Sequence, residues 1–296
     1  MEINKRYKTI NDYNETTVYK NNEDIKVIKI KRDNNVYSVS LSEQMGLVLK
    51  GDTFEALRDI GDKSIDLIII DPPYGTTDCD WDVTPNWSEL FTEYNRVIKD
   101  NGAILVFAQQ PVATDIITAN RKYFRYEIVW EKDNALGFLN AKKMPLRAHE
   151  LILVFYKHRP IYNPQMSEGK PYKTKQRSAG QVYKEKKILV ETVNEGTRYP
   201  RDVIRGFKQE RGLHPTQKPV SLLKWLIETY SQPGEVVLDT FAGSGSTGVA
   251  AIKTERSYIL VEKDETYYET IVKRIDESYE EVYNTRIKER CYNEEK

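Results

Sequence analysis

The sequence has little cysteine and little histidine. Among its 296 residues are two cysteines, Cys79 and Cys291, and three histidines. Because these residues show no ligand-like spacing, we expect no zinc site and no other metal site. Scarce cysteine is typical of proteins of the reducing cytoplasm, which is where we expect this chain to act.

Long hydrophobic runs are also missing. No stretch approaches the roughly 18 apolar residues of a membrane-spanning helix. Residues 1–5 begin no apolar stretch of the kind found in secretory signals, so we expect no signal peptide. Apolar residues still make up 39% of the chain and charged residues 30%, which indicates a folded core beneath a soluble surface.

An excess of charge of either sign is absent from the chain as a whole. Its 45 basic and 45 acidic residues cancel, which argues against a nucleic-acid binder. The charges are unevenly distributed, however. Residues 157–211 hold 14 Lys and Arg against six Asp and Glu, a local charge of +8, whereas residues 262–296 hold seven against 11. The basic segment is either a polyanion-binding surface or an ordinary solvated one.

Short apolar runs alternate with helical stretches along most of the chain. Such runs are typical of parallel strands that are buried on both faces. They lie at 47–49, 65–70, 103–107, 126–130, 151–155, 236–238 and 258–261. The pattern predicts an α/β fold with a doubly wound sheet of seven strands.

The segments that break this rhythm divide the chain. Residues 157–213 combine many bases with scattered Gly, Pro and Tyr and have no clear period, so they are interpreted as an inserted subdomain. A helix is predicted at 219–231 with Pro219 at its first position, and an amphipathic helix from about 265 to 290, packed on its own sheet. The predicted parts are an N-terminal extension (1–45, with a possible hairpin turn at 33–35), two halves of the main domain (46–156 and 214–276), the insertion (157–213) and a helical tail (277–296).

A glycine-rich turn, Asp239 to Thr247, follows one strand and opens a helix. Gly243 and Gly245 would let the backbone approach a ligand closely, although tight packing of strand against helix also explains them. The turn lacks the lysine of a phosphate-binding P-loop and the spacing of a dinucleotide fold. Glu262, at the end of the next strand, can accept both hydroxyls of a ribose. A phosphate-free adenosine ligand fits this combination best.

A second motif, Asp71-Pro72-Pro73-Tyr74, ends the predicted strand 65–70, where ligands bind in an open α/β sheet. Pro72 keeps Asp71 out of the helical region, so the Asp71 carboxylate and the Pro72 carbonyl become fixed neighbouring acceptors. Two acceptors that hold both hydrogens of an exocyclic amine would favour a pyramidal nitrogen, with its lone pair aimed at a sulfonium methyl. Tyr74 offers a face on which a base outside the duplex can stack. The alternative is a strand-ending turn with an aromatic plug.

Together the two motifs resemble those of the amino-methylating DNA methyltransferases. The catalytic motif precedes the cofactor motif with the insertion between them, an order similar to that of the circularly permuted β group. Residues 214–219 (His-Pro-Thr-Gln-Lys-Pro) also resemble that group, and the stretch from 130–134 through 147–150 is similar to its phage and prophage members. The similarity covers residues 46–276 and leaves out both ends of the chain.

The resemblance implies a circularly permuted, methyltransferase-like Rossmann sheet and direct methyl transfer from S-adenosylmethionine to adenine N6 in a specific double-stranded DNA sequence. Transfer would need no metal and no covalent enzyme intermediate. The implied catalytic residues are Asp71, Pro72, Pro73 and Tyr74. The implied cofactor residues are Asp52 near the adenine, Thr216 and Lys218 beside the methionine, Glu262 at the ribose, and Asp239, Phe241, Gly243, Ser244, Gly245, Ser246 and Thr247 in the turn.

The insertion corresponds to the family's target-recognition region. Its lysines are expected to contact phosphates, and its arginines are candidates for reading bases. The candidates are Lys170, Lys173, Lys175, Arg177, Arg198, Arg201 and Arg205. Double-stranded DNA is the expected partner, while a second copy of the chain and a cognate restriction endonuclease remain open.

Three alternatives stay open. Cytosine N4 presents the same amine geometry, although that class more often has Ser where this chain has Asp71. A nicotinamide dehydrogenase is disfavoured by the missing third glycine, and a catalytically decayed DNA-binding module by the intact Asp71–Tyr74 motif. His149 and Glu150 are expected to make structural hydrogen bonds, and Cys79 to be a packing residue. The acidic residues Asp78, Asp80 and Asp82 have no account beyond capping a helix.

Overall fold

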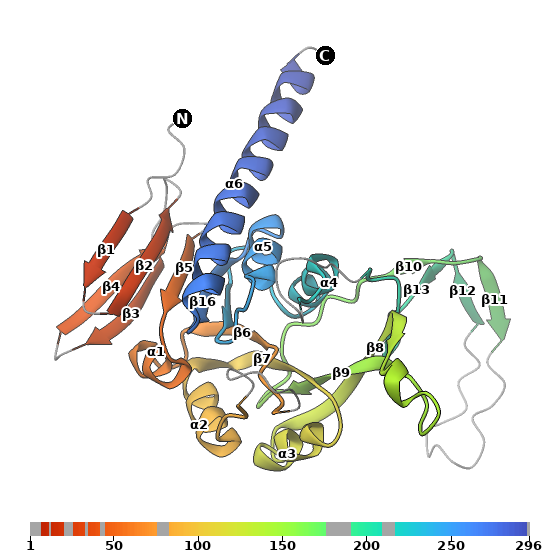
Figure 1. Ribbon diagram of the computed structural model, residues 1–296. Helices are drawn as coiled ribbons and strands as arrows, with labels where there is room; N and C mark the ends of the chain where they lie inside the picture. Colours follow the sequence, from red (N-terminus) through yellow and green to blue (C-terminus); the bar gives the residue numbers. More distant parts are fainter. Residues whose placement is uncertain are drawn as a thin grey trace. The chain divides into compact units, whose positions relative to one another are not determined.

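The computed structural model describes residues 7–11, 13–20, 26–32, 35–41, 45–75, 83–175, 191–208 and 217–294 (Figure 1). The chain forms two compact units. The main unit comprises the chain up to Asn163 and from Val203 onward, and the small unit is Pro164–Asp202. None of the described helices is both long and apolar enough to cross a membrane.

The main unit is built on a mixed sheet that contains all seven predicted strands. Three further strands, β1, β2 and β14, extend it to ten among the described residues, so the predicted number of seven is wrong. The order across the sheet is β1 (Tyr7–Asn11), β2 (Tyr13–Lys20), β5 (Met45–Lys50), β16 (Ser257–Glu262), β15 (Val236–Asp239), β6 (Ile65–Ile70), β7 (Ile98–Ala108), β9 (Arg147–Phe155), β8 (Phe124–Leu136) and β14 (Val203–Ile204).

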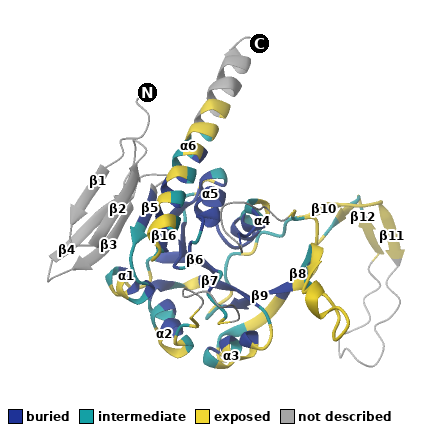
Figure 2. Cartoon of the chain, viewed as in Figure 1, coloured by how far each residue is buried: buried dark blue, intermediate teal, exposed yellow. Residues whose placement is uncertain are grey.

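The five strands from β5 to β7 run parallel, and β9 is antiparallel to both of its neighbours. Helices cover both faces of this sheet (Figures 1 and 2). Strand β6 shows why its sequence is continuously apolar: Leu67 and Ile69 belong to one core cluster, and Ile68 and Ile70 to the other. One layer contains α1 (Thr53–Asp59), α2 (Trp87–Val97) and α3 (Val112–Ala119), and the other α4 (Val220–Tyr230), α5 (Ser246–Lys253) and α6 (Glu265–Glu294).

Two helix predictions can be compared directly. Tyr268, Ile271, Val272 and Ile275 of α6 are buried in the core cluster, which confirms that this helix packs on its own sheet. Pro219 is the N-cap of α4 rather than its first residue, because its extended ψ of 130° lies outside the helical region.

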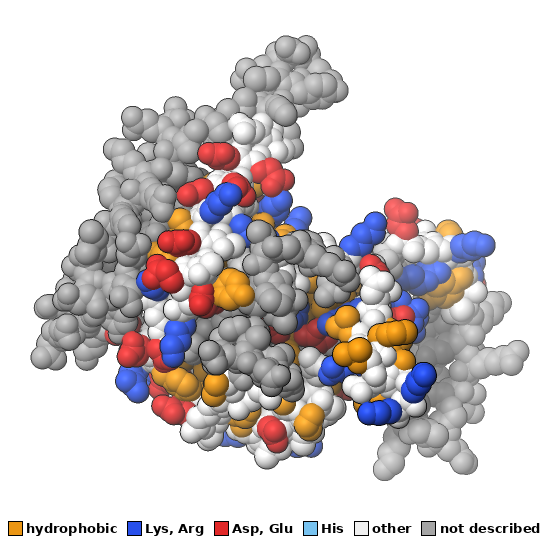
Figure 3. All heavy atoms as spheres, in the orientation of Figure 1, with side chains coloured by type: hydrophobic (Ala, Val, Ile, Leu, Met, Phe, Trp, Pro, Cys, Tyr) orange, Lys and Arg blue, Asp and Glu red, His pale blue; other side chains and the backbone are white. Residues whose placement is uncertain are grey.

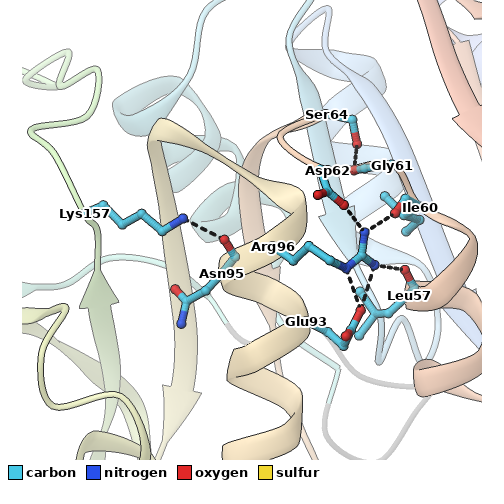
Figure 4. A network of polar contacts seen from close by, with 9 residues as sticks. All are labelled: Leu57, Ile60, Gly61, Asp62, Ser64, Glu93, Asn95, Arg96 and Lys157. Carbon is cyan, nitrogen blue, oxygen red and sulfur yellow. Dashed lines mark hydrogen bonds and ion pairs between the residues drawn. The ribbon is translucent and has the colours of Figure 1, made fainter.

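A polar network fixes α1 against α2 (Figure 4). The Arg96 guanidinium donates to the carbonyls of Leu57 and Ile60 at 2.6 and 2.8 Å. It also pairs with Glu93 and Asp62, each at 2.7 Å. The last carbonyls of a helix have no partner within the helix, and Arg96 supplies one here. The C-terminal end of α1 is thereby tied to α2.

Two elements lie outside the large sheet. Strands β3 (Lys26–Arg32) and β4 (Asn35–Leu41) pair antiparallel with Arg32 opposite Asn35, the hairpin expected there. Residues 33 and 34 are not among the described residues. A 3₁₀ helix, η1 (Phe138–Asn140), lies between β8 and β9.

The small unit contains two two-stranded sheets. They are formed by β10 (Ser167–Glu168) with β13 (Thr197–Arg198), and by β11 (Tyr172–Lys175) with β12 (Glu191–Asn194). This unit is shorter than the predicted insertion because both flanks belong to the main unit. Asn163 bonds to carbonyls around the end of α4, and β14 pairs parallel with β8.

Candidate active site

The carboxyl ends of β6, β15 and β16 meet at one edge of the sheet, because these neighbouring strands run parallel. A cavity of about 900 Å³ opens there. It is lined from both predicted motifs, by Asp71 and Tyr74 after β6 and by Asp239, Phe241 and Glu262 after β15 and β16. The glycine-rich turn and the Asp71–Tyr74 tetrapeptide, far apart in sequence, therefore share one cavity.

The glycine-rich turn is shaped by Asp239. This buried carboxylate accepts from the Phe241 amide at 3.0 Å and from the Thr247 hydroxyl at 2.6 Å. Burial raises the pKa of Asp239 to about 7, although the two hydrogen bonds oppose the shift. Gly243 and Gly245 have φ values of +52° and +78°, a conformation that L side chains rarely adopt. Gly243 lines the cavity. Gly245 does not: a Cβ there would lie 3.1 Å from Ile271, so this glycine permits close packing of the turn on α6.

Glu262 holds the other side of this turn. Its Oε2 accepts from the Gly243 amide at 2.8 Å and its Oε1 from the Asp264 amide at 2.9 Å. Each carboxylate oxygen can accept a second hydrogen bond, so two hydroxyls of a ligand could still be held. Burial raises the pKa of Glu262 despite these bonds. Asp52 caps α1 through the Phe54 amide at 2.9 Å and also lines the cavity.

Asp71 lies at one end of a network of ion pairs that also includes Lys218, Glu150 and Lys132. The Lys218 ammonium donates to Asp71 Oδ2, and the Tyr74 hydroxyl donates to Asp71 Oδ1 at 2.8 Å. Lys218 Nζ also lies 3.0 Å from Glu150 Oε1, and Lys132 Nζ lies 2.6 Å from Glu150 Oε2. Two carboxylates and two ammonium groups thus alternate, so the network carries no net charge.

Burial and the charged neighbours together set the pKa values in this network. Burial would raise the pKa of Glu150, but Lys218 and Lys132 beside it lower the pKa below its usual value. Burial alone would lower the pKa of Lys218, yet Asp71 and Glu150 raise it. Burial and the two neighbouring carboxylates raise the pKa of Tyr74 well above its usual value. Tyr74 therefore stays neutral and donates a hydrogen bond instead of acting as a base.

Lys218 lines the cavity, and its ammonium contacts the carboxylates of Asp71 and Glu150. Its expected place beside a methionine moiety stays a prediction. Glu150, expected to be only structural, links Lys132, Lys218 and Tyr74. The sequence offered one signal: Glu150 immediately precedes a fully apolar strand, where a carboxylate needs a buried partner.

The other predicted residues fall into three groups. Pro72 and Pro73 line the cavity. The Ser244 and Ser246 hydroxyls both accept from Arg274 of α6 at 3.1 Å and so fasten the turn to that helix. Thr216, Cys79, Asp78, Asp80 and Asp82 lie outside the described residues.

The predicted DNA-binding residues differ in the exposure of their side chains and in the contacts that these side chains make. Lys170, Lys173 and Arg201 are exposed, whereas Arg177 and the Lys175 side chain lie outside the described residues. Arg198 is engaged within the small unit, 4.7 Å above the Tyr172 ring and bonded to Asn194. Arg205 belongs to the main unit and pairs with Glu131 at 2.7 Å. Arg198 therefore supports the small unit in this state.

The fold and cavity define an α/β protein in which a glycine-rich turn and an Asp-Pro-Pro-Tyr tetrapeptide line one cavity at the carboxyl edge of the sheet. Residues 65–273 match the sequence model of a family described as DNA methylase (N6_N4_Mtase). The chain belongs to this DNA methylase family.

Relatives and solved structures agree with this assignment. The DNA adenine methyltransferase YhdJ of Escherichia coli (strain K12) is 31% identical over 77% of this chain and 82% of its own length. A crystal structure of M1.HpyAVI in complex with SAM is 25% identical, with a TM-score of 0.54 over 77% of this chain and 98% of that one. The cytosine-N4-specific PvuII DNA methyltransferase, 17% identical, has the same fold with a TM-score of 0.55 over 81% of this chain and 93% of that one.

Proposed function

We propose that this protein is a site-specific DNA methyltransferase that transfers a methyl group from S-adenosylmethionine to adenine N6. The observation that carries the proposal is the shared cavity. The Asp71–Tyr74 tetrapeptide and the glycine-rich turn line it together at one edge of the sheet. Family membership supports DNA methylation, the adenine methyltransferase relative supports adenine, and the SAM complex of M1.HpyAVI supports the cofactor.

The residues of the cavity fit a cationic adenosine derivative. Six acidic residues line it against four basic ones, a balance that favours a sulfonium over a dinucleotide phosphate. Trp130 also lines the cavity, and its buried Nε1 has no hydrogen-bond acceptor among the described residues. Glu262 and the Gly243 backbone would hold the ribose end, and Asp239 the positively charged end.

When bound, S-adenosylmethionine supplies an electrophilic methyl group. The protein's part is to hold the amine for in-line attack. Asp71 Oδ1 and the Pro72 carbonyl would accept its two hydrogens, and the Tyr74 ring would stack on the base. Lys218 and the Tyr74 hydroxyl fix the Asp71 carboxylate, so little reorganisation is needed at the moment of transfer. The released proton can leave to solvent, so no general base is needed.

The order of motifs supports a circularly permuted, β-group arrangement. The tetrapeptide at Asp71–Tyr74 precedes the cofactor turn, so residues 46–156 form the catalytic half and 214–276 the cofactor half. The basic insertion, 157–213, which contains the small unit, would recognise the target sequence. Residues 1–45 and 277–296 would be additions to this core.

Cytosine N4 is the second candidate, because the PvuII enzyme shares the fold. The test is to incubate the protein with isotope-labelled S-adenosylmethionine and unmethylated DNA, digest the DNA and analyse its nucleosides by mass spectrometry. Label in N6-methyladenine supports the proposal. Label in N4-methylcytosine, or in no nucleoside while cofactor binding is intact, overturns it. Asp71→Ala serves as the control for contaminating activity.

A further inference from the structure

The tip of the β8–β9 hairpin, residues 136–147, exposes hydrophobic side chains that the proposed chemistry does not use. Leu139 is 98% exposed and Phe138 80% exposed. Leu136, Met144 and Leu146 are each at least 40% exposed. The tip is coloured exposed throughout in Figure 2. A contiguous exposed apolar group of this kind marks an interaction surface.

The tip is attached directly to the cavity. Leu136 and Arg147 lie opposite each other at the base of the tip, and both line the cavity. Arg147 is held there by Gln109, whose Oε1 accepts from its guanidinium at 2.8 Å. A duplex that delivers a base to this side of the cavity would lie next to the tip.

The tip is also locally ordered. Gly137 has a φ of +89°, which turns the chain into the 3₁₀ helix η1. The Ala141 amide then bonds to the Phe138 carbonyl at 3.0 Å, and the Lys143 and Met144 amides to the Asn140 carbonyl at 2.8 and 3.0 Å. Backbone hydrogen bonds thus hold Phe138 and Leu139 outward on a short helical turn.

The charge on the tip favours a polyanion. Lys142, Lys143 and Arg147 are exposed, and residues 134–149 contain no acidic residue. In Figure 3, hydrophobic and basic side chains lie together over the region that Figure 1 assigns to this hairpin end. A second protein chain could cover the apolar side chains, but three exposed cations on the tip, one of which also lines the cavity, match nucleic acid better.

We infer that the tip is a DNA wedge: Leu139, with Phe138, enters the duplex at the place that the target base vacates, and Lys142 and Lys143 bind the flanking phosphates. The inference rests on the proposed function. A base held beside Asp71 must leave the stack, which costs a few kcal/mol. Apolar side chains that insert between base steps offset part of that cost and stabilise the distorted duplex.

The test uses the full-length double variant Phe138→Ala/Leu139→Ala, with Asn140→Ala as the matched control at an exposed polar position of the same turn. Single-turnover methylation is compared on a normal duplex and on a duplex whose target adenine faces an abasic site, where the base leaves the stack easily. The wedge predicts a loss of about tenfold or more for the double variant on the normal duplex. On the abasic duplex both variants should remain within about twofold of the parent protein.

Further readouts separate the wedge from other roles. Fluorescence of 2-aminopurine at the target position should rise with the parent protein and much less with the double variant. Replacing Lys142 and Lys143 by Gln should reduce the salt slope of DNA binding by about two units. An equal loss on both duplexes, no loss on either, or a parent dimer that the double variant dissociates would overturn the wedge. A parent protein inactive on every DNA would instead overturn the proposed function.

Discussion

Lys218, two residues before α4, donates from its ammonium to the carboxylate of Asp71 at the end of β6. The same ammonium lies 3.0 Å from Glu150. One cation thus joins the partly buried Asp71, after β6, to the buried Glu150 of β9. Removing one partner of such a buried pair costs about 3–5 kcal/mol, because the remaining charges lose their compensation. The relationship gives Lys218 a positioning role for Asp71.

Lys218→Met should lower kcat more than it raises KM for DNA. Without the ammonium, burial and the repulsion from Glu150 raise the pKa of Asp71 further, so that less of it is ionised at neutral pH. Activity should therefore recover partly as the pH rises. The pH profile of kcat measures this, and Lys218→Arg, which keeps a cation, should restore much of the parent profile. A variant profile parallel to the parent's would show that Lys218 acts only on folding.

The contribution of Tyr74 to activity should depend on its hydroxyl as well as on its ring. Stacking alone contributes about 1–3 kcal/mol, which predicts that Tyr74→Phe retains activity and Tyr74→Ala does not. The hydroxyl, however, donates to Asp71 and reaches Glu150 at 3.3 Å. We therefore expect Tyr74→Phe to fall between the parent and Tyr74→Ala in kcat at saturating DNA. A Phe variant equal to the parent would limit Tyr74 to stacking.

Binding of S-adenosylmethionine should weaken below pH 7. Asp239, with a pKa of about 7 in the free protein, is ionised only above that pH, and a cationic ligand favours the ionised form. Calorimetry at pH 6 and pH 8 should differ by about tenfold in affinity, and Asp239→Asn should remove the difference. If the Asp239→Asn variant kept the pH dependence, another group, such as Glu262, would be responsible for it.

The raised pKa of Asp239 also predicts how the stability of the protein depends on pH. The direction is opposite to that for a carboxylate whose pKa is lowered by an ion pair. The folded-state pKa of Asp239 lies above its unfolded value, so the folded protein binds more protons between these values. The free energy of unfolding should therefore fall as the pH rises from about 4 to about 7. Chemical denaturation of Asp239→Asn should show a smaller fall than the parent over the same window.

The small unit should supply part of the DNA affinity. Lys170 and Lys173 are exposed, and replacing both by Gln should weaken binding to all sequences alike and lower the salt slope by about two units. Lys273→Gln, at an exposed position of α6, is the matched control. If the double variant binds like this control at every salt concentration, the basic segment is a solvated surface.

The sequence predicts the central sheet well, because strands such as β6 are buried on both faces and must be apolar throughout. It does not predict β14, which has two residues, or β1 and β2, whose polar sequences show no clear alternation of apolar and polar residues. The motifs predict the cavity residues for a similar reason: backbone geometry at Asp71 and Gly243 is encoded locally. The ion pairs of Glu150 with Lys132 and Lys218 join three distant segments. No local sequence pattern predicts which charged residues will contact each other.

The central claim is that Asp71 acts on the amine and leaves cofactor binding to other residues. The most direct test combines calorimetry with S-adenosylmethionine and methyl transfer to DNA for Asp71→Ala. The account predicts cofactor affinity close to that of the parent and a loss of transfer well beyond tenfold, or about 1.4 kcal/mol. Transfer within about tenfold of the parent, or loss of cofactor binding that accounts for the whole defect, would contradict it.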